Sequence, residues 1–322
     1  MKKKLLSGLV ILGAASMLCG FDSAETLDSL SAKMNEASAD IKGATAEATF
    51  NLDAAVAISD GTTNASLGVN ANGGLNYLFS MDPFAMKADI DLTFSALGSG
   101  EQIKEEIYAV TDENGAMKMY MNVTDPGTGV DQWIVQTIED LNMNELIATA
   151  GTQTMSFSEM ADWGITFALA PEASDVNGTE CYLISATIDS ASFQTLLQKS
   201  EELTGQDILS DPNVSMVLSL LDGLKMNIEY YVDAATYMPI KAHLDMNGSD
   251  FSMISQLING ILGATASDEA PASTIDLTVN DVSMDLSMNY GEAQTITVPQ
   301  EALDAEASGT ATSAENLAAA IG

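Results

Sequence analysis

The chain has 322 residues, of which 46% are hydrophobic and 6% aromatic, and its formal net charge is −35 at pH 7. All eleven basic residues are lysine, so the chain lacks the bidentate guanidinium that phosphate and carboxylate sites favour. Nucleic acid and anionic lipid head groups repel so acidic a chain, which excludes a nucleic-acid-binding protein. Its hydrophobic content is typical of a folded protein and not of a disordered acidic tail.

Residues 1–20 have the pattern of a lipoprotein-type signal peptide. Lysines at positions 2–4 precede an apolar run, Leu5–Leu18, which is shorter than the roughly twenty residues of a spanning helix. Cys19 ends the run and is the candidate lipid anchor, although Leu18 is bulky where a lipoprotein site has a small residue. Ordinary cleavage, after position 16 or after position 20, is the alternative. The chain is therefore predicted to be exported, and to sit on the outer face of the cell membrane if Cys19 is lipidated or to be secreted if it is not.

Strands dominate the first half of the chain after this leader. A helix is predicted over residues 24–42, where apolar residues recur at intervals of three and four. The period then changes to two, and turn residues separate the apolar segments. The predicted strands are 46–58, 63–80, 86–97, 105–112, 116–123 and 131–137. Consecutive strands joined by tight turns indicate an antiparallel meander.

Helices interrupt the strands in the second half. Helical segments are predicted at 138–150, near 156–163, at 190–203 and at 211–223, and residues 250–263 fit a helix or a strand. Strands are predicted at 163–170, 179–188, 224–236, 238–247, 274–291 and 295–299. We expect a mainly β (α+β) fold: one strongly curved antiparallel sheet, an incomplete barrel with helices on its concave side. The predicted domain covers residues 24–304, and a flexible tail covers 305–322.

No motif for catalysis is present, so the chain is predicted not to be an enzyme and to need no cofactor. The Gly-x-Ser-x-Gly, His-Glu-x-x-His, P-loop and Gly-x-Gly-x-x-Gly patterns are all missing. The single histidine, His243, lies on a predicted strand and is expected to be half-exposed. Cys181 is expected to be a buried, inert thiol, and a disulfide with Cys19 is open only if Cys19 is not acylated. A hydrolase that uses two carboxylates remains an alternative.

Carboxylates that alternate along two strands offer a second alternative, a calcium site. These are Asp89 and Asp91 on one strand, and Asp276, Asp281 and Asp285 on another. None of them fits the 12-residue EF-hand loop. In so acidic a chain a solvated strand face is the simpler interpretation, and no metal is predicted.

Methionine is the more informative residue type. Met117, Met119 and Met121 alternate with Lys118 and Tyr120, so the three methionines share one side of a strand. The candidate ligand-contacting residues are Met117, Met119, Met121, Met226, Met246, Met284 and Met288. Methionine is flexible and polarizable, and it suits surfaces that adapt to varied apolar shapes. The same residues could equally fill a core, and the pattern alone does not separate the two interpretations.

The order of several weak motifs resembles the LolA/LppX-like envelope lipoproteins, particularly the LolA-like lipoproteins of Firmicutes. The segment 230–247 has the form strand, Asp, Thr-aromatic-x-Pro, strand. The other matching pieces are the helix at 24–42, the methionine strand at 116–123, Trp133 in its strand, the segment 177–189 and the segment 289–304. The poor lipid-attachment site, the lack of arginine and insertions near 139–160 and 249–273 depart from the family.

The resemblance implies a half-open barrel with an apolar cavity, plugged by helices, that binds lipids or acyl chains. On that basis the methionines would line the cavity, and the membrane, through the anchor, and a lipid would be the partners. The alternative is a structural or interaction lipoprotein without a small ligand. The carboxylate hydrolase is the third hypothesis, and no nucleic-acid partner is expected.

Overall fold

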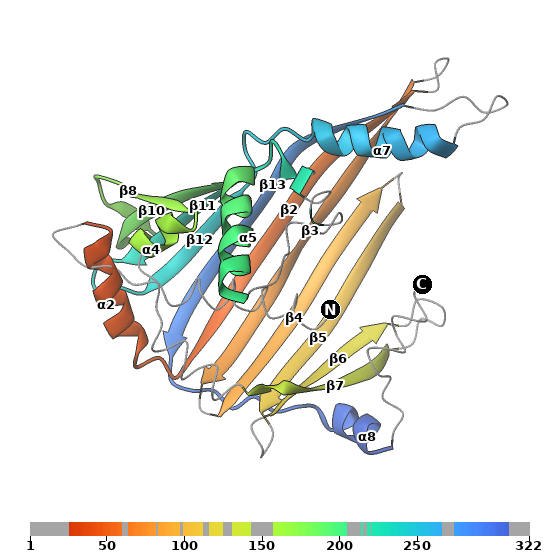
Figure 1. Ribbon diagram of the computed structural model, residues 1–322. Coiled ribbons are helices and arrows are strands. Elements are labelled where there is room, and N and C mark those ends of the chain that lie inside the picture. The colour runs from red at the N-terminus through yellow and green to blue at the C-terminus, as the bar shows by residue number, and fades with distance from the viewer. Residues whose placement is uncertain are drawn as a thin grey trace.

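The structure is a computed structural model (Figure 1), and all structural statements concern the residues that it describes. These are residues 26–59, 64–81, 83–96, 99–111, 116–124, 131–142, 157–204, 214, 218–219, 221–265 and 274–308. The predicted signal peptide with Cys19 and residues 309–322 of the predicted tail lie outside this set. Within the described part, no helix combines the length and apolar character needed to cross a membrane.

Twelve strands form one antiparallel sheet, which confirms the predicted fold class. The first half of the chain supplies a meander: β2 (Gly43–Ser59), β3 (Asn64–Met81), β4 (Phe84–Ala96), β5 (Ser99–Thr111), β6 (Ala116–Thr124) and β7 (Asp131–Asn142). The second half supplies β8 (Thr166–Leu169), β9 (Ser174–Val176), β10 (Thr179–Asp189), β11 (Lys225–Asp233), β12 (Pro239–Asp245) and β13 (Thr274–Gly291). The spatial order is β7-β6-β5-β4-β3-β2-β13-β12-β11-β10-β8, and β9 pairs with β10. Because β13 pairs with β2, the two halves are joined in the middle of the sheet, and its outermost strands, β7 and β8, leave the barrel open (Figure 1).

Five described helices accompany the sheet: α2 (Asp28–Ser38), α4 (Phe157–Asp162), α5 (Ser190–Thr204), α7 (Ser252–Thr265) and α8 (Gln300–Ser308). Four of them, α2, α4, α5 and α7, lie over or beside β8 to β13. We call the sheet face that these helices contact the inner face and the opposite one the outer face.

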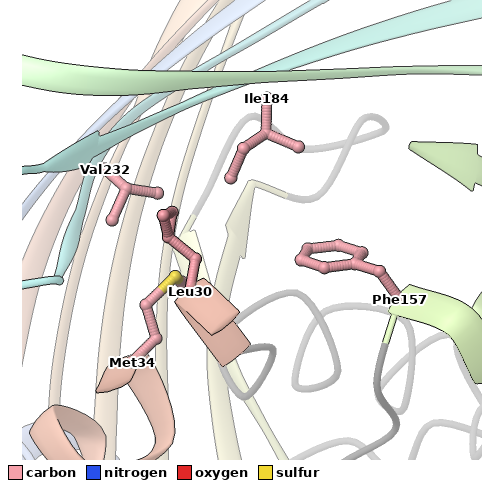
Figure 2. Packing of buried hydrophobic residues seen from close by; sticks show 5 residues of the cluster. All are labelled: Leu30, Met34, Phe157, Ile184 and Val232. Atoms are coloured by element: carbon pink, nitrogen blue, oxygen red, sulfur yellow. The ribbon is translucent and has the colours of Figure 1, made fainter. Parts of the chain in front are cut away.

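Figure 2 shows the main packing of helices on the inner face. Leu30 and Met34 of α2 point toward Ile184 of β10 and Val232 of β11, and Phe157 of α4 approaches from the other side. Leu30, Ile184 and Val232 have no exposed surface. Burying each such side chain contributes about 1.5–3 kcal/mol, so this cluster fixes α2 and α4 on the sheet.

The motif at 230–247 has a structural explanation in the turn between β11 and β12. The carboxylate of Asp233 accepts a hydrogen bond from the hydroxyl of Thr236 at 2.8 Å. Tyr237 has a φ of 58°, which is uncommon for a bulky residue. This conformation places its ring against Tyr182, with the centroids 6.4 Å apart, and 4.5 Å from the Lys33 Nζ of α2. The turn therefore serves as a second anchor for α2.

Alternation along the strands makes the sheet amphipathic. Every even-numbered residue of β2 is apolar and faces inward, from Ala44 to Ile58, while the odd positions are mostly polar. The register carries this pattern across β3 to β7, so apolar side chains form a continuous inner face. Asn, Asp, Ser and Thr occupy most outer positions of β2, β3 and β13. One face of an antiparallel sheet can be solvated in this way while the other is covered.

The Gly73-Gly74 pair in the middle of β3 brings two strands unusually close. A Cβ added to Gly73 would lie 2.8 Å from the Cα of Leu92 in β4 and would also meet the backbone oxygen of Asp91. A Cβ added to Gly74 would find its nearest neighbour, the oxygen of Ala48, at 3.5 Å. Only Gly73 is therefore needed for the close approach, which is typical of a strongly bent sheet.

Helix α7 covers a strand edge that β12 leaves open. β12 pairs with β13 up to Ser283, and the amide of Met246 still donates to the carbonyl of Val282, so the segment from Thr274 to Asp281 has only β2 as a neighbouring strand. The side chain of Asn259 donates to the carbonyl of Ile275 at 2.7 Å and accepts from its amide at 2.5 Å, and Ser255 accepts from the amide of Leu277. These side chains replace a neighbouring strand, which protects the edge from pairing with other chains.

Helix α8 departs from the expectation that the helices lie on the concave side. Together with the segment before it, α8 packs on the outer face of β5, β6 and β7. Ile296, Val298 and Ala302 contact Tyr108 and Tyr120 there. Both tyrosines occupy even positions whose neighbours, Ala109 and Met119, face inward. The reason is local: apolar residues occupy both sides of these strands, so the outer side also needs cover.

Several predicted elements need correction. Residues 138–142 continue strand β7 and are not helical, and 295–299 do not form a strand. Residues 305–308, at the start of the predicted tail, form the last turn of α8. The ambiguous segment at 250–263 is helical, because its side chains cap β13 from outside the sheet.

Replacing Gly73 by alanine tests the close approach in β3. We expect Gly73→Ala to lower the free energy of unfolding by about 1–3 kcal/mol, since the backbone of β4 must move away. Gly74→Ala is the matched control and should be neutral or stabilising by up to about 1 kcal/mol, because it only reduces the entropy of the unfolded chain. Urea titrations followed by circular dichroism give both values. Equal effects of the two substitutions would contradict the assignment.

Candidate functional site

The inner face of β13 and β2 to β6 is the largest apolar feature of the described sheet. Its middle carries small residues, with Ala46, Ala48, Ala71 and Ala88 all buried. Larger side chains surround them in register, for example Met288, Ala46, Tyr77, Ala88, Ile107 and Met121 across one row. Side chains converge on the concave side of a bent sheet, so alanine at the centre relieves crowding there.

The pKa values of two tyrosines indicate that this face is apolar. Tyr77 of β3 and Tyr290 of β13 both point inward, each opposite an alanine of β2. Burial raises the pKa of Tyr77 to about 12, and burial alone also raises the pKa of Tyr290. A raised tyrosine pKa means that the phenolate is poorly solvated. Both rings are therefore largely surrounded by apolar side chains of the inner face.

The predicted methionines share this face but do not form one cluster. Met117, Met119 and Met121 point inward from β6, and Lys118 and Tyr120 point outward, as the alternation predicts. Met226, Met284 and Met288 lie on the inner face of β11 and β13, and Met246 follows β12. Strands β6 and β13 are five positions apart, which is about 24 Å at the usual spacing between strands. The seven methionines thus mark two separate regions of the face.

Burial separates the methionines further. Met117 and Met288 are each 7% exposed, and Met117 packs against Phe84, Met86 and Met119. Met226 packs in the cluster of Ile188 and Ile228 beneath α5. These three side chains act as core residues in the structure, and their role in contacting a ligand remains a prediction.

An exposed apolar patch lies on β4 and β5, where no candidate residue was predicted. Phe94 of β4 and Ile103 of β5 are 41% and 36% exposed, and both point inward next to Leu92. Glu101 and Glu105 flank Ile103 on the same side of β5. The predicted strand began at residue 105, so Ile103 was missed, whereas β5 begins at Ser99. The only available signal was the alternation of Ile103 with Ile107, which glutamates interrupt.

The outer face carries the carboxylates, and most of them have partners. Asp91 accepts hydrogen bonds from Gln102 at 2.7 Å and pairs with Lys104 at 3.2 Å. On β13, Asp281 accepts from Asn51, and Asp285 pairs with Lys241 at 2.9 Å. Within the described residues, no three His, Cys, Asp or Glu side chains are arranged to hold a metal ion. The candidate calcium ligands, Asp276 among them, therefore lie on a solvated strand face.

His243 lies on this outer face and belongs to a small charge network. Its Nδ1 is 3.2 Å from Asp285, and its Nε2 is 3.6 Å from Asp245. Burial pushes the pKa of Asp285 upward, but hydrogen bonds from Lys241 and His243 outweigh it and leave this pKa below its usual value. The network stabilises the pairing of β12 with β13.

The described residues around Cys181, and the carboxylates that a hydrolase would use, are not arranged for catalysis. Cys181 is fully buried, and burial with the charges of Asp233 and Asp175 raises the pKa of its thiol. A raised pKa disfavours the reactive thiolate. The buried polar side chains of the described residues are five serines, Ser29, Ser31, Ser80, Ser192 and Ser255. The converging buried carboxylates that the hydrolase hypothesis requires are thus absent from the described part of the chain.

The predicted methionines do not line either of two hollows on the described residues. The larger has a volume of about 580 Å³ and lies over β3 to β7, mainly among outer-face polar residues such as Asp89, Asp91 and Lys104. The smaller, about 190 Å³, lies beside Tyr182 and the segment 169–173.

Comparison with known proteins identifies a family. The model of DUF6612, described as a family of unknown function, matches residues 26–255, which is most of the sheet and its helices. No curated protein matches the chain.

Solved structures that match the chain include a mycobacterial lipoprotein. Lipoprotein LppX of Mycobacterium tuberculosis is 9% identical, with 83% of this chain and 95% of LppX covered and a TM-score of 0.29. LprF of Mycobacterium bovis is 14% identical, with coverages of 87% and 99% and a TM-score of 0.27. A putative outer membrane lipoprotein-sorting protein domain from Vibrio parahaemolyticus is 9% identical, with coverages of 85% and 95% and a TM-score of 0.20. At these values the likeness carries no argument about what this chain binds.

The pairing of Asp285 makes a pH-dependent contribution to stability. Because its folded pKa is depressed, the carboxylate stabilises the fold above its unfolded pKa of about 3.9, and this contribution is lost as the pH falls through the folded value. Asp285→Asn should therefore destabilise the protein at pH 7 by less than about 1 kcal/mol, since solvent screens this half-exposed group. The difference should decrease progressively as the pH falls below about 3.9 and the carboxylate becomes protonated. Urea midpoints of both proteins from pH 7 down through this range provide the measurement, and a difference that does not decrease in acid would contradict the assignment.

Proposed function

The chain belongs to DUF6612, a family that brings no assigned activity, and from its own structure we propose that it is an exported envelope protein that binds the acyl chain of a lipid on the inner face. The observation that carries the proposal is the exposed pair Phe94 and Ile103, beside the half-buried Leu92, on an apolar face whose other large hydrophobic side chains are buried or half-buried. A soluble chain gains stability by covering such a patch. An apolar ligand provides that cover without adding charge to a chain at −35.

The shape of the face suits a long, narrow ligand. The inner residues of β4 extend from Phe84 to Phe94, ten residues of strand, or about 34 Å. The hydrocarbon core of a whole bilayer is about 30 Å thick, so one acyl chain fits within this length. Each buried methylene contributes about 0.8 kcal/mol, and a chain lying on the face could therefore bind without any charged partner. Glu101 and Glu105 would keep the end of the patch hydrated.

The methionines extend the same argument to the β6 side of the face. Met119 and Met121 are only partly buried, and the inner-face residue Ile90 of β4 lies between the row of Met121 and the patch. Flexible thioethers can adjust to ligands of different length and unsaturation. We therefore assign Met119 and Met121 to the ligand-contacting surface and treat Met117, Met226 and Met288 as core.

A structural or interaction role without a small ligand is the second candidate, and one observation favours it. Met117 and Met288 are nearly fully buried by the protein itself, as a filled interior requires. In that case the patch at Phe94 would be covered by a protein partner. The experiment below separates the two candidates, because only the first predicts a lipid in the purified protein.

Native mass spectrometry of the mature protein tests lipid binding directly. We expect a mass increment from co-purified lipid in the wild type, and its loss in Phe94→Asp, since a carboxylate in an apolar contact costs several kcal/mol unless it stays hydrated. Ser95→Asp is the matched control, because Ser95 is the next residue along β4 and points to the outer face. Thermal unfolding with and without oleic acid gives an independent measure of binding.

The outcomes of this experiment differ clearly. Loss of lipid in Phe94→Asp with retention in Ser95→Asp supports the inner-face site. No lipid in the wild type and no thermal shift with oleic acid would reject lipid binding and leave the structural role. Retention of lipid in both variants would place the ligand away from Phe94, and equal loss in both would contradict a site specific to the inner face.

The proposal includes the anchor at Cys19 and the position on the outer face of the membrane. An acidic body without arginine agrees with export, and the motif at residues 1–20 supplies the signal. Intact mass of the mature protein from cells provides the test. A chain that begins at a diacylated Cys19 is expected, whereas one that begins at Met17 or Phe21 would show a secreted protein without an anchor.

A further inference from the structure

The segment after β13 connects the middle of the sheet to its β7 side along the outside. Residues 292–308, here called the C-terminal strap, begin beside β2: Glu292 pairs with Lys42 at 2.8 Å, and the Cβ position of Gly43 is 3.2 Å from the Cα of Ala293. The strap then passes the ends of the neighbouring strands and finishes in α8 (Figure 1). It thus joins two parts of the sheet that the strand order separates.

Few residues of the strap bridge this separation. Strand β13 lies four positions from β5 and five from β6, about 19–24 Å at the usual strand spacing. Seven residues separate Gly291, the end of β13, from Val298, which is buried against Tyr108 and Tyr120 of β5 and β6. An extended chain of this length spans at most about 25 Å. The strap therefore limits how far β5 to β7 can swing away from β13.

Helix α8 fastens the far end of the strap to strand β6. Ala302 has no exposed surface and packs among the tyrosines and Val298. Glu306 accepts a hydrogen bond from the Nζ of Lys118 at 2.8 Å and another from the hydroxyl of Tyr120 at 2.7 Å. These two bonds, the first of them with Lys118, lower the pKa of Glu306, so the carboxylate is charged and paired at neutral pH. Charge-assisted bonds of this kind are the stronger ones.

Strand β6, which α8 contacts through Glu306, is also the strand that carries Met117, Met119 and Met121. Lys118 and Tyr120 point outward to Glu306, and Met117, Met119 and Met121 point inward between them. A movement of β6 on the outside is therefore a movement of these methionines on the inside. Because side chains alternate along β6, contacts on its outer face and contacts on its inner face act on the same stretch of backbone.

We propose that the C-terminal strap is a clasp that controls access to the inner face. With α8 docked, the strap holds β5 to β7 in the curved state. With α8 released, these strands can open, and the apolar face exchanges its ligand more readily. This inference rests on the proposed function for its ligand, but the docking of α8 can be measured without one.

Two variants of the full mature chain release the clasp in different ways. Glu306→Gln removes the charge that Lys118 and Tyr120 hold, and Ala302→Asp places a carboxylate in the buried contact. Glu301→Gln is the matched control, since Glu301 is exposed on the same helix and undergoes the same substitution. Hydrogen exchange reports on α8, and circular dichroism confirms that the sheet is retained.

The ligand readout is the release of cis-parinaric acid to excess phosphatidylcholine vesicles in a stopped-flow instrument. We expect the amides of α8 to exchange at least about 10-fold faster in Glu306→Gln and Ala302→Asp than in the control, as for the loss of one charge-assisted bond. The release rate of cis-parinaric acid should rise by at least about threefold in the same two variants.

Each other result overturns a defined part of the inference. Unchanged exchange in α8 would show that Glu306 and Ala302 do not fasten the strap. Faster exchange with an unchanged release rate would show that the strap does not control access. If the wild type does not bind cis-parinaric acid, oleic acid or any co-purified lipid, the proposed function fails, whereas the exchange data still decide whether α8 is a clasp on β6.

Discussion

The structure depends on one constraint: side chains alternate across a single sheet that does not close. An antiparallel strand that is apolar at every second residue has to cover one side and can solvate the other. Because twelve strands share this pattern, the sheet has an apolar face that is far larger than the area covered by the described helices. Helices α2, α4 and α5 cover the part formed by β8, β10 and β11. Over β4 and β5, Phe94 and Ile103 remain exposed to solvent. The candidate site is therefore the part of the inner face that this cover does not reach.

The open edges of the sheet create a second requirement, which side chains meet in place of strands. Asn259 bonds both backbone groups of Ile275, so a helix can lie where β12 has ended. The amide side chain carries a donor and an acceptor in the geometry of a peptide group, which explains why asparagine suits this position. The same helix contains no charged residue over residues 252–265, in a chain of high charge. An uncharged helix can approach the apolar face without desolvating an ionised group.

Alternation also explains how much of the fold was predictable. A period of two is a local property, and it located β2, β3, β6 and β10 to within three residues at each end. The meander followed from the turn residues between them. The pairing of β13 with β2 had no local signal, because it depends on which long strands match in length and register. The predicted end of β7 was wrong for a similar reason. Residues 138–142 have the sequence pattern of a helix, but they pair with β6 and therefore continue the strand.

The candidate site was harder to predict, because burial is a property of neighbours. The sequence grouped seven methionines by residue type, but the register separates them by about 24 Å and buries Met117 and Met288 within the core. Phe94 looked like any other strand aromatic. Its exposure arises because Ala71 and Glu101, its partners on either side, offer little apolar cover.

The outer contacts of β6 show why a site on this fold cannot be understood from one face alone. A strand in the middle of a sheet is held by two neighbours, but β6 has only the edge strand β7 beyond it. Tyr108, Tyr120 and Trp133 therefore gather on its outer side, where Val298 and Ala302 complete their burial. Burial of Tyr120, with its bond to Glu306, raises the pKa of that tyrosine, so the phenol stays a hydrogen-bond donor at neutral pH. The strand that carries the inward methionines is thus also held, on the opposite side of the sheet, by aromatic packing and by a carboxylate from a segment that is far from it in the sequence.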